Sequence, residues 1–377
     1  MKLRVDRDIL AEAVTWTARS VPARPPVPVL AGVRLEAKGS SLVLASFDYE
    51  VSAHCEVAAD VEEDGVVLVS GRLLADIAKA LPNKPVDLEV EGNKVAVSCG
   101  SARFSLAAMA ADDYPALPAM PGVAGTVDAH DLAQAVAQVV IAASRDETLP
   151  LLTSVQMQVE GERLTLMATD RYRLAVREMT WSPQDAGLTT HALLKARTLS
   201  DVAKSLTSTG DVTVALTEAG ASSSGLIGFE AGGRRTTSLL TDGDYPPVRR
   251  LFPESTSIHA TVGTDELMAA VRRVSLVADR STPIHMSFTQ GNLELDAGQG
   301  DDAQATEQLV AHLEGDDIST AFNPGYLLDG LGALNQPYVR LDFTHASKPA
   351  VLTGMDSIGG TEDSSFRYLL MPIRFGA

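Results

Sequence analysis

Apolar residues recur at helical spacing near the start of the chain. Leu10, Val14, Ala18 and Val21 fall on one side of a helix, and Asp6 precedes them where a carboxylate caps the first free amides. The segment 71–82, GRLLADIAKALP, repeats this spacing, with Leu73, Leu74, Ile77, Ala78 and Leu81 on one face and Pro82 as its stop. The pattern predicts two amphipathic helices.

Between and after these helices the period changes to two. Val86–Val90 alternates apolar and polar residues, as do Lys94–Val97 and Arg163–Leu166, and turns with the sequence Glu-Gly-Asn or Glu-Gly-Glu separate such segments. This alternation is typical of antiparallel strands with one face buried. The combination predicts an α+β unit with a sheet on one side and two helices on the other.

The unit occurs three times. VDRDILAEAV (5–14) returns as VDAHDLAQAV (127–136) and VGTDELMAAV (262–271), a repeat of about 120 to 135 residues, which is the size of a domain. Further phrases follow in constant order, including LVLASFDYEV (42–51) and LTLMATDRYRLAV (164–176). Each copy ends near a proline, at Asp113-Tyr114-Pro115, Asp244-Tyr245-Pro246 and Leu370-Met371-Pro372. We therefore expect three related domains, at 1–120, 126–252 and 256–377.

Composition agrees with several globular cores, because 45% of the 377 residues are hydrophobic and 21% are charged. The opening MKLRVDRDIL lacks the apolar stretch of a signal peptide, and no apolar run reaches the roughly 18 residues that span a bilayer. We expect a soluble, cytoplasmic protein without a membrane partner. Cys55 and Cys99 are expected to be free thiols, since that compartment is reducing.

The net charge of −18 argues at first against nucleic acid, which usually needs a basic face. Acidic residues, however, cluster in candidate turns, whereas basic residues recur in or beside the helical phrases. Such segregation is compatible with one acidic and one basic surface. Ordinary solvated faces explain the same pattern, and the charges alone favour that explanation.

Motifs for catalysis are missing from the sequence: no phosphate-binding loop, zinc-protease helix or nucleophile elbow is present. His54 and Cys55 are adjacent and would point to opposite faces of a strand, so we expect no metal site. Asp112 and Asp113 beside Tyr-Pro are typical of a turn. Gly330-Leu331-Gly332 lacks the strand-then-helix context of a dinucleotide loop. We expect no cofactor and no enzymatic activity.

Specific phrases resemble one family, the bacterial sliding clamps, which are the beta subunits of DNA polymerase III. The resemblance covers 1–375 and rests on a few phrases: RPPVPVL (24–30), ARFSL (102–106), ATDRYRLA (168–175), DYP (244–246) and YLLMPIR (368–374). It implies a homodimeric ring of clamp domains around duplex DNA, with helices lining the hole and antiparallel sheets outside. The implied partners are double-stranded DNA held without sequence preference, the polymerase alpha subunit, the clamp loader and other proteins with a clamp-binding motif.

The resemblance also implies a hydrophobic groove for short partner peptides. Two departures affect it, since Arg171 stands where many relatives have glycine, and the chain continues past Phe375. Without the resemblance, Leu369–Phe375 is better explained as a final strand, with Met371 in the core. The groove residues, by position, are Leu152, Thr169, Tyr172, Arg173, Leu174, Pro246, Arg250, Leu251, Tyr326, Pro349, Leu369, Met371, Pro372, Ile373 and Arg374.

A dimer contact and a DNA contact are implied as well. The dimer contact would join Phe104 and Leu106 of one protomer to Leu276 and Val277 of its partner, with Arg103 against Asp301 or Glu307. Alternation along 103–106 fits a core strand equally well. Arg24 in the proline-rich loop is the best candidate for DNA contact, and the others come from helix position: Arg72, Arg145, Arg197 and Arg280.

The hypothesis from the sequence is a non-catalytic processivity clamp. The first alternative is an enzyme of nucleotidyl transfer or phosphodiester cleavage, which would need a carboxylate cluster for metal ions that the sequence does not show. The second is a peptide-binding scaffold that does not hold DNA.

Overall fold

The structure is a computed structural model, and it describes residues 1–205, 210–217, 225–277, 282–298 and 303–373. The chain forms two compact units. Unit 1 comprises Met1–His130, Trp181–Ala186 and Asp201–Leu240, and unit 2 comprises Asp131–Thr180, Gly187–Ser200 and Thr241–Ala377. Each unit contains strands from two of the predicted repeats, so the domain boundaries drawn from the sequence remain a prediction.

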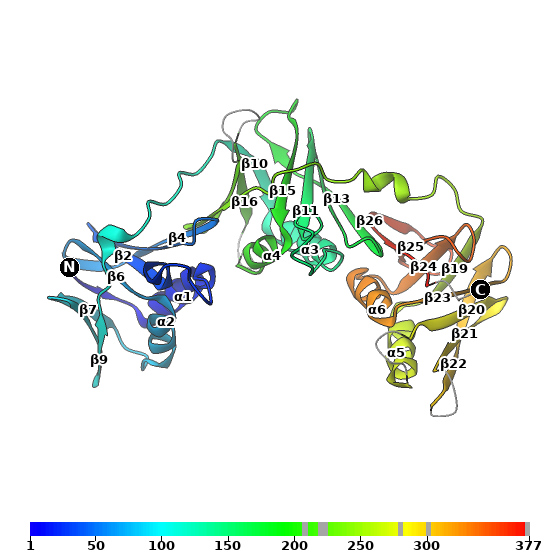
Figure 1. The fold of residues 1–377 in the computed structure, drawn as a ribbon, viewed down its shortest axis with the longest axis horizontal. Helices are drawn as coiled ribbons and strands as arrows, with labels where there is room; N and C mark the ends of the chain where they lie inside the picture. Colours follow the sequence, from blue (N-terminus) through cyan, green and yellow to red (C-terminus); the bar gives the residue numbers. More distant parts are fainter. Residues whose placement is uncertain (206–209, 218–224, 278–281, 299–302, 374–377) are drawn as a thin grey trace. The chain divides into compact units, whose positions relative to one another are not determined.

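Unit 1 contains two antiparallel sheets (Figure 1). The smaller has the order β5 (Asp60–Glu63), β1 (Lys2–Val5), β7 (Val86–Glu91), β8 (Lys94–Cys99) and β9 (Ala102–Ala107). The larger has the order β14 (Ser182–Pro183), β10 (Val123–Asp128), β16 (Asp211–Leu216), β17 (Leu226–Ala231), β18 (Arg234–Leu239), β4 (Val51–Ala58), β3 (Ser41–Phe47), β2 (Gly32–Lys38) and β6 (Gly65–Ser70). Strand β18 pairs with β4, which joins the second copy to the first.

Helices α1 (Arg7–Thr17) and α2 (Gly71–Ala80) pack together in unit 1. The Asp6 carboxylate accepts hydrogen bonds from the amides of Asp8 and Ile9 at 2.8 and 3.2 Å, as the N-cap prediction required. Most residues of the apolar face predicted for α2 are buried. Leu73 is 49% exposed, so its assignment to that face was wrong. It lies at the flank of the stripe that Leu74 and Ile77 define.

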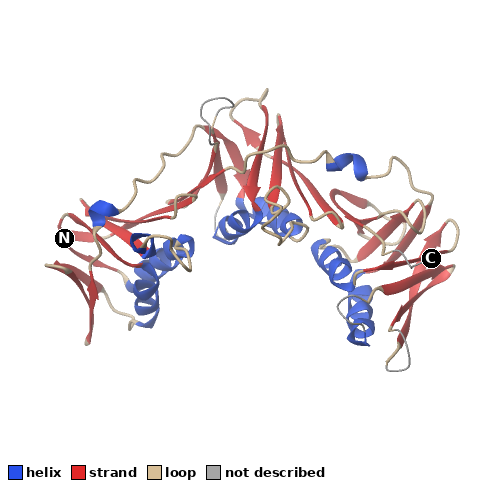
Figure 2. Ribbon diagram, viewed as in Figure 1, coloured by secondary structure: helices blue, strands red, loops and turns tan. Residues whose placement is uncertain are grey.

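Unit 2 is built on one long antiparallel sheet (Figure 2). Its order is β15 (Thr189–Lys195), β11 (Ser154–Glu160), β12 (Arg163–Thr169), β13 (Arg173–Thr180), β26 (Glu362–Leu370), β25 (Ala350–Met355), β24 (Tyr338–Phe343), β19 (Ile258–Gly263), β22 (Ala305–Glu314), β21 (Gly291–Ala297), β20 (Ile284–Thr289) and β23 (Ile318–Phe322). The β13–β26 pairing joins the second copy to the third.

Helices α5 (Thr264–Val274) and α6 (Pro324–Ala333) pack together in unit 2. Two further helices, α3 (Ala129–Val140) and α4 (Ala196–Ser205), each contain residues of both units. Short 3-10 turns are η1 (Ala18–Ser20), η2 (Pro28–Ala31), η3 (Ala111–Asp113), η4 (Val248–Leu251) and η5 (Ser275–Val277). The predicted α+β class with antiparallel sheets is confirmed.

Candidate functional site

A tight turn between β12 and β13 carries several of the predicted groove residues. Its shape is fixed by side chains, because the Thr169 hydroxyl donates to the Arg173 carbonyl at 2.6 Å. The Asp170 carboxylate accepts from the amides of Tyr172 and Arg173 at 3.0 and 3.1 Å. Arg171 has a φ of 82°, a left-handed conformation that favours glycine. Glycine in relatives at this position is therefore explained by the backbone.

Arg173 is the buried polar centre of the site and is only 6% exposed. Its Nε donates to Asp170 at 2.9 Å, and its Nη1 donates to Asp329 at 2.6 Å. The guanidinium lies 4.3 Å from the centroid of the Tyr326 ring. Burial acts to lower the pKa of Arg173, but Tyr368, Asp329 and Asp170 together raise it above its ordinary value. Arg173 therefore holds the turn, helix α6 and strand β26 together.

The segment after β26 continues along the same turn. The Met371 amide donates to the Tyr172 carbonyl at 2.9 Å, and the Ile373 amide donates to the Ala321 carbonyl at 2.8 Å. The rings of Tyr172 and Tyr326 stack with centroids 6.3 Å apart. Pro372 and Ile373 are half-buried, whereas Met371 is 39% exposed. Met371 is therefore at the surface and does not fill the core.

A small apolar core lies next to the turn, on one face of the sheet of unit 2. Leu174 and Leu369 oppose each other on β13 and β26 and are 1% and 2% exposed. A segment that we name the strap, residues 245–252, crosses this face and contributes Tyr245, Val248 and Phe252 to the core. Its remaining members are Met167, Val176, Leu193 and Leu151.

The predicted groove residues thus fall into three groups by exposure. The buried ones form the floor: Thr169, Arg173, Leu174 and Leu369. The half-buried ones are Leu152, Tyr326, Pro349, Pro372 and Ile373. The exposed ones form the rim: Tyr172, Pro246, Arg250, Leu251 and Met371. Arg374 lies outside the described residues.

Sequence reasoning missed Tyr245 as a site residue. Its phenolic oxygen accepts a hydrogen bond from the Thr169 amide at 3.0 Å, and burial raises the pKa of Tyr245 to about 12. The repeated Asp-Tyr-Pro phrase was the available signal, because Tyr114 accepts from the Phe47 amide at 2.6 Å at the matching place in unit 1. Both tyrosines fasten the segment after them to the end of the third strand of their repeat.

Two other residues were missed or discarded. Asp329, on α6, is the second carboxylate partner of Arg173. No sequence pattern indicated this contact, because the two residues are far apart in the sequence. Gly330 was considered only as part of a weak dinucleotide motif. A Cβ at Gly330 would lie 2.5 Å from the Tyr368 ring, so this glycine allows α6 to pack closely on β26.

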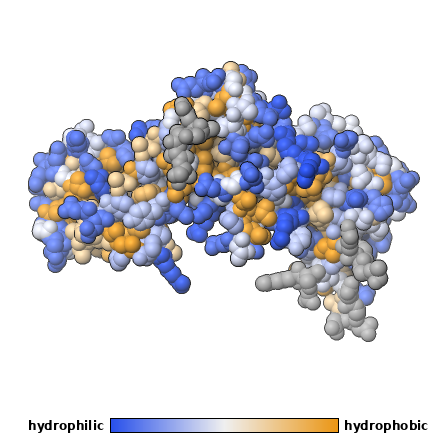
Figure 3. Space-filling model, turned by 45° about the horizontal axis from the view of Figure 1, so that its top comes forward, coloured by the Kyte–Doolittle hydropathy of each residue, from blue (hydrophilic) through white to orange (hydrophobic). Residues whose placement is uncertain are grey.

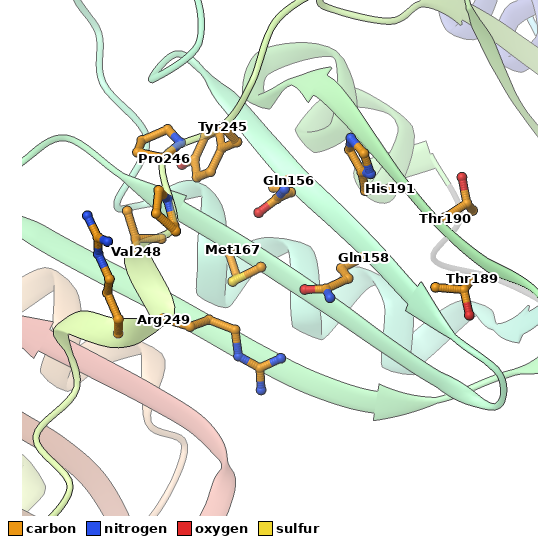
Figure 4. Close-up of a pocket in the computed structure, with 12 residues that line it drawn as sticks. Gln156, Gln158, Met167, Thr189, Thr190, His191, Tyr245, Pro246, Val248 and Arg249 are labelled. Carbon is orange, nitrogen blue, oxygen red and sulfur yellow. The ribbon is translucent and has the colours of Figure 1, made fainter. Parts of the chain in front are cut away.

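A cavity of about 540 Å³ lies beside the strap (Figure 4). It contains the predicted groove residues Pro246 and Arg250 but extends away from Leu174 over strands β11 and β15. Figure 4 shows the amides of Gln156 and Gln158 on the sheet and the strap along one side. The other lining residues are Met167, Thr189, Thr190, His191, Tyr245, Pro247, Val248 and Arg249.

The candidate DNA-contacting arginines come from several elements. Arg24 follows η1 and Arg72 lies on α2, both in unit 1. Arg145 and Arg197 follow α3 and start α4. These four are exposed, and within the described ranges none forms an ion pair with a carboxylate. Arg280 lies outside the described residues.

Among the candidate dimer residues, Phe104 and Leu276 are exposed, at 39% and 83%. Leu106 is 3% exposed and packs in the core of unit 1, which is the alternative that the sequence left open. Arg103 donates to the backbone carbonyls of Gly100 and Ala102. Val277 is half-buried, and Glu307 accepts a hydrogen bond from Arg273 Nε of its own chain at 3.0 Å. Asp301 lies outside the described residues.

The described part of the chain offers little for metal or thiol chemistry. No group of three or more His, Cys, Asp or Glu side chains is placed there to hold a metal ion. Cys55 and Cys99 are both buried free thiols. No helix in the same residues is long and apolar enough to cross a membrane. Apolar side chains on the surface appear in separate patches among hydrophilic ones (Figure 3).

Comparison with known proteins covers the whole length of the chain. Three family models match, described as the N-terminal, central and C-terminal domains of the DNA polymerase III beta subunit, at residues 1–118, 126–247 and 249–374. The beta sliding clamp of Streptomyces coelicolor is 54% identical over 99% of each chain.

Two solved structures have the same fold. The DNA polymerase sliding clamp of Bacillus subtilis is 26% identical, covers 100% of both chains and has a TM-score of 0.92. A sliding clamp of Pseudomonas aeruginosa, bound to griselimycin, is 26% identical over 100% of both chains with a TM-score of 0.91. The chain therefore belongs to the bacterial sliding clamp family, the beta subunits of DNA polymerase III.

Proposed function

We propose that two copies of this chain close head to tail into a ring around duplex DNA. As a member of its family, the chain is a DNA sliding clamp, a processivity factor that catalyses no reaction itself. A ring holds DNA by topology, so its electrostatic attraction to phosphates can stay weak and independent of sequence. The net charge of −18 is compatible with this design.

The partner-binding part of the proposal rests on one observation, the exposed apolar rim above a buried floor. Tyr172 and Met371 are joined by a backbone hydrogen bond and are 55% and 39% exposed, and Leu251 on the strap is 52% exposed. Covering one such side chain with an apolar peptide residue contributes about 1.5–3 kcal/mol. We assign this groove to short peptides of the polymerase alpha subunit, the clamp loader and other proteins with a clamp-binding motif.

Ring closure is assigned to the edge of unit 1 and to the region around η5. Phe104 lies on β9, the last strand of its sheet, whose outer edge pairs with no other strand among the described residues. Leu276 is an apolar side chain that is 83% exposed, and a partner that covered it would remove this apolar surface from water. We propose that these two side chains meet across each of the two contacts of the ring, beside Arg103 and Val277.

DNA contact is assigned to Arg24 first, then to Arg72, Arg145 and Arg197. Free guanidinium groups suit phosphate contact, because they require no ion pair to be broken beforehand. Arg280 stays in this set from its position in the sequence. We place the ring in the cytoplasm, where chromosomal DNA and the polymerase meet.

The test is topological. The clamp is loaded onto nicked circular DNA with its loader, the complex is isolated at high salt, and the DNA is then cut once. We expect the clamp to stay on the circle and to leave after the cut. Loss from the intact circle, with peptide binding retained, would instead indicate the peptide-binding scaffold.

A further inference from the structure

The cavity beside the strap belongs to the same sheet face as Leu174 and Leu369 of the groove floor. Residues directly opposite on antiparallel strands share a face, so the sheet can be followed in cross-strand rows. One row runs Leu193, Gln156, Met167, Val176 and Arg367. Gln156 and Met167 of this row line the cavity, and Val176 of the same row belongs to the core under the strap. The cavity and this core therefore lie on one face of the sheet.

The neighbouring rows connect the cavity to the groove. Leu174 and Leu369 form the next row in one direction, and Gln158 with His191 forms the next in the other. Adjacent rows are about 7 Å apart, the length of two extended residues. Pro246 and Arg250 belong to both the groove rim and the cavity wall. A peptide seated in the groove would therefore reach the cavity with about two to four further residues.

The sheet side of the cavity carries the neutral amides of Gln156 and Gln158, and its strap side carries the cations Arg249 and Arg250. Arg250 has no hydrogen-bond or ion-pair partner within the described ranges. Arg249 pairs with Glu178, and the same carboxylate lies 3.9 Å from Arg367. Arg249 and Arg367 thus share one carboxylate, and Arg250 beside them is left without one. The Gln158 amide nitrogen donates to Glu160 at 3.0 Å, while Arg163 Nε lies 3.8 Å from the Glu160 carboxylate.

The matching place in unit 1 gives a contrast. A cavity of about 300 Å³ lies there, beside Tyr114 and Pro115, at positions that correspond to Tyr245 and Pro246. Its charged lining residues satisfy each other, because Arg34 Nη1 lies 2.7 Å from the Glu36 carboxylate. In unit 2 the equivalent strand positions carry glutamines, and the added cation Arg250 is unpaired. The cavity in unit 2 thus has one guanidinium, that of Arg250, without a partner among the described residues, where the cavity in unit 1 has an ion pair.

We propose that this cavity is an accessory subsite for acidic residues that flank the groove-binding segment of a partner peptide. Arg250 is the cation that pairs with the acidic side chain, and Gln156 and Gln158 donate hydrogen bonds to the extended segment. This subsite rests on the proposed groove. It would bind the acidic residues of the peptide next to the hydrophobic residues that occupy the groove. Charge complementarity selects the occupant, because an acidic segment is attracted to this patch on a chain that otherwise repels acids.

The experiment compares synthetic peptides by fluorescence anisotropy on the full-length clamp. The reference is the clamp-binding peptide of the polymerase alpha subunit, and the others extend it at either end by Gly-Glu-Glu, Gly-Gln-Gln or Gly-Lys-Lys. We expect Gly-Glu-Glu at one end to bind about fivefold more tightly than Gly-Gln-Gln, the gain of one charge-assisted hydrogen bond. Gly-Lys-Lys should bind no better than Gly-Gln-Gln, and the gain should shrink as salt is raised.

Gln158→Glu adds a negative charge to the cavity, which repels the glutamates of the peptide. It should reduce the affinity gain of Gly-Glu-Glu over Gly-Gln-Gln to less than twofold and leave binding of the reference peptide unchanged. Gln184→Glu adds the same charge at an exposed position in unit 1 and should leave the gain intact. Failure of the reference peptide to bind overturns the proposed groove, and the subsite with it. Reference binding without a gain from Gly-Glu-Glu overturns the subsite alone, as does a gain that Gln158→Glu leaves unchanged.

Discussion

The phenolic oxygen of Tyr245 accepts a hydrogen bond from the Thr169 amide at 3.0 Å, at the point where β12 enters the turn of the groove. Thr169 in turn donates its hydroxyl to the Arg173 carbonyl, so the strap and the turn are linked in series. Tyr114 makes the same bond to the Phe47 amide in unit 1, where no groove is assigned. The chain thus contains two tyrosines with matching hydrogen bonds, of which Tyr245 holds the turn of the proposed groove and Tyr114 holds a strand end outside it.

Tyr245→Phe should weaken peptide binding, whereas Tyr114→Phe should not. Each change leaves a strand-end amide without its partner, at a cost of about 1–3 kcal/mol in the free energy of unfolding. Only at Tyr245 does the loosened turn carry groove residues. Urea unfolding would report the shared destabilisation, and fluorescence anisotropy with the polymerase peptide would report the difference. Equal peptide affinity in the two variants would contradict a positioning role for Tyr245.

The same tyrosines predict how stability depends on alkaline pH. Burial raises the pKa of Tyr114 and of Tyr245 to about 12, from an ordinary value of about 10. Between these values the unfolded chain has lost the phenolic proton and the folded chain still holds it. Stability is therefore fully present below pH 10 and falls as pH rises toward 12, by about 1.4 kcal/mol per pH unit for each tyrosine.

Urea unfolding of the wild type and of the double variant with Tyr114→Phe and Tyr245→Phe, each followed from pH 9 upward, would check this dependence. The double variant should be less stable at pH 9 and should show a shallower decline above pH 10. Parallel declines in both proteins would show that other groups control alkaline unfolding.

The sequence predicted the repeat, the two helices of its first copy and the strands because each depends on local periodicity. It did not predict which groove residues are exposed, because Leu174 is buried in a core that the strap completes from far away in the sequence, whereas Tyr172 lies in the turn and stacks on Tyr326. Asp329 was out of reach for a related reason. Its contact with Arg173 depends on the packing of α6 against β26, and no short-range pattern records such a contact.

Arg171→Gly should raise stability. The φ of 82° at Arg171 is disfavoured for any residue with a Cβ, and removing that strain outweighs the greater freedom of glycine in the unfolded chain by about 0.5–1 kcal/mol. Gly161→Ala, at a φ of 59° in the β11–β12 turn, is the reverse change and should lower stability by a similar amount. Both effects would appear in the urea midpoint, and a loss of stability in Arg171→Gly would mean that its side chain makes a compensating contact.

Leu276→Asp and Leu106→Ala separate the assembly of the ring from the stability of its subunit. Leu276 is 83% exposed, so an aspartate there should leave unfolding almost unchanged while placing a charge in the proposed contact with Phe104. Leu106 is 3% exposed, and its truncation should cost about 2–5 kcal/mol by leaving a cavity in unit 1. Sedimentation velocity is expected to find a dimer for the wild type and a monomer for Leu276→Asp. A dimeric Leu276→Asp protein would remove this residue from the interface, because an unpaired aspartate buried at each of two contacts is too costly for the ring to absorb.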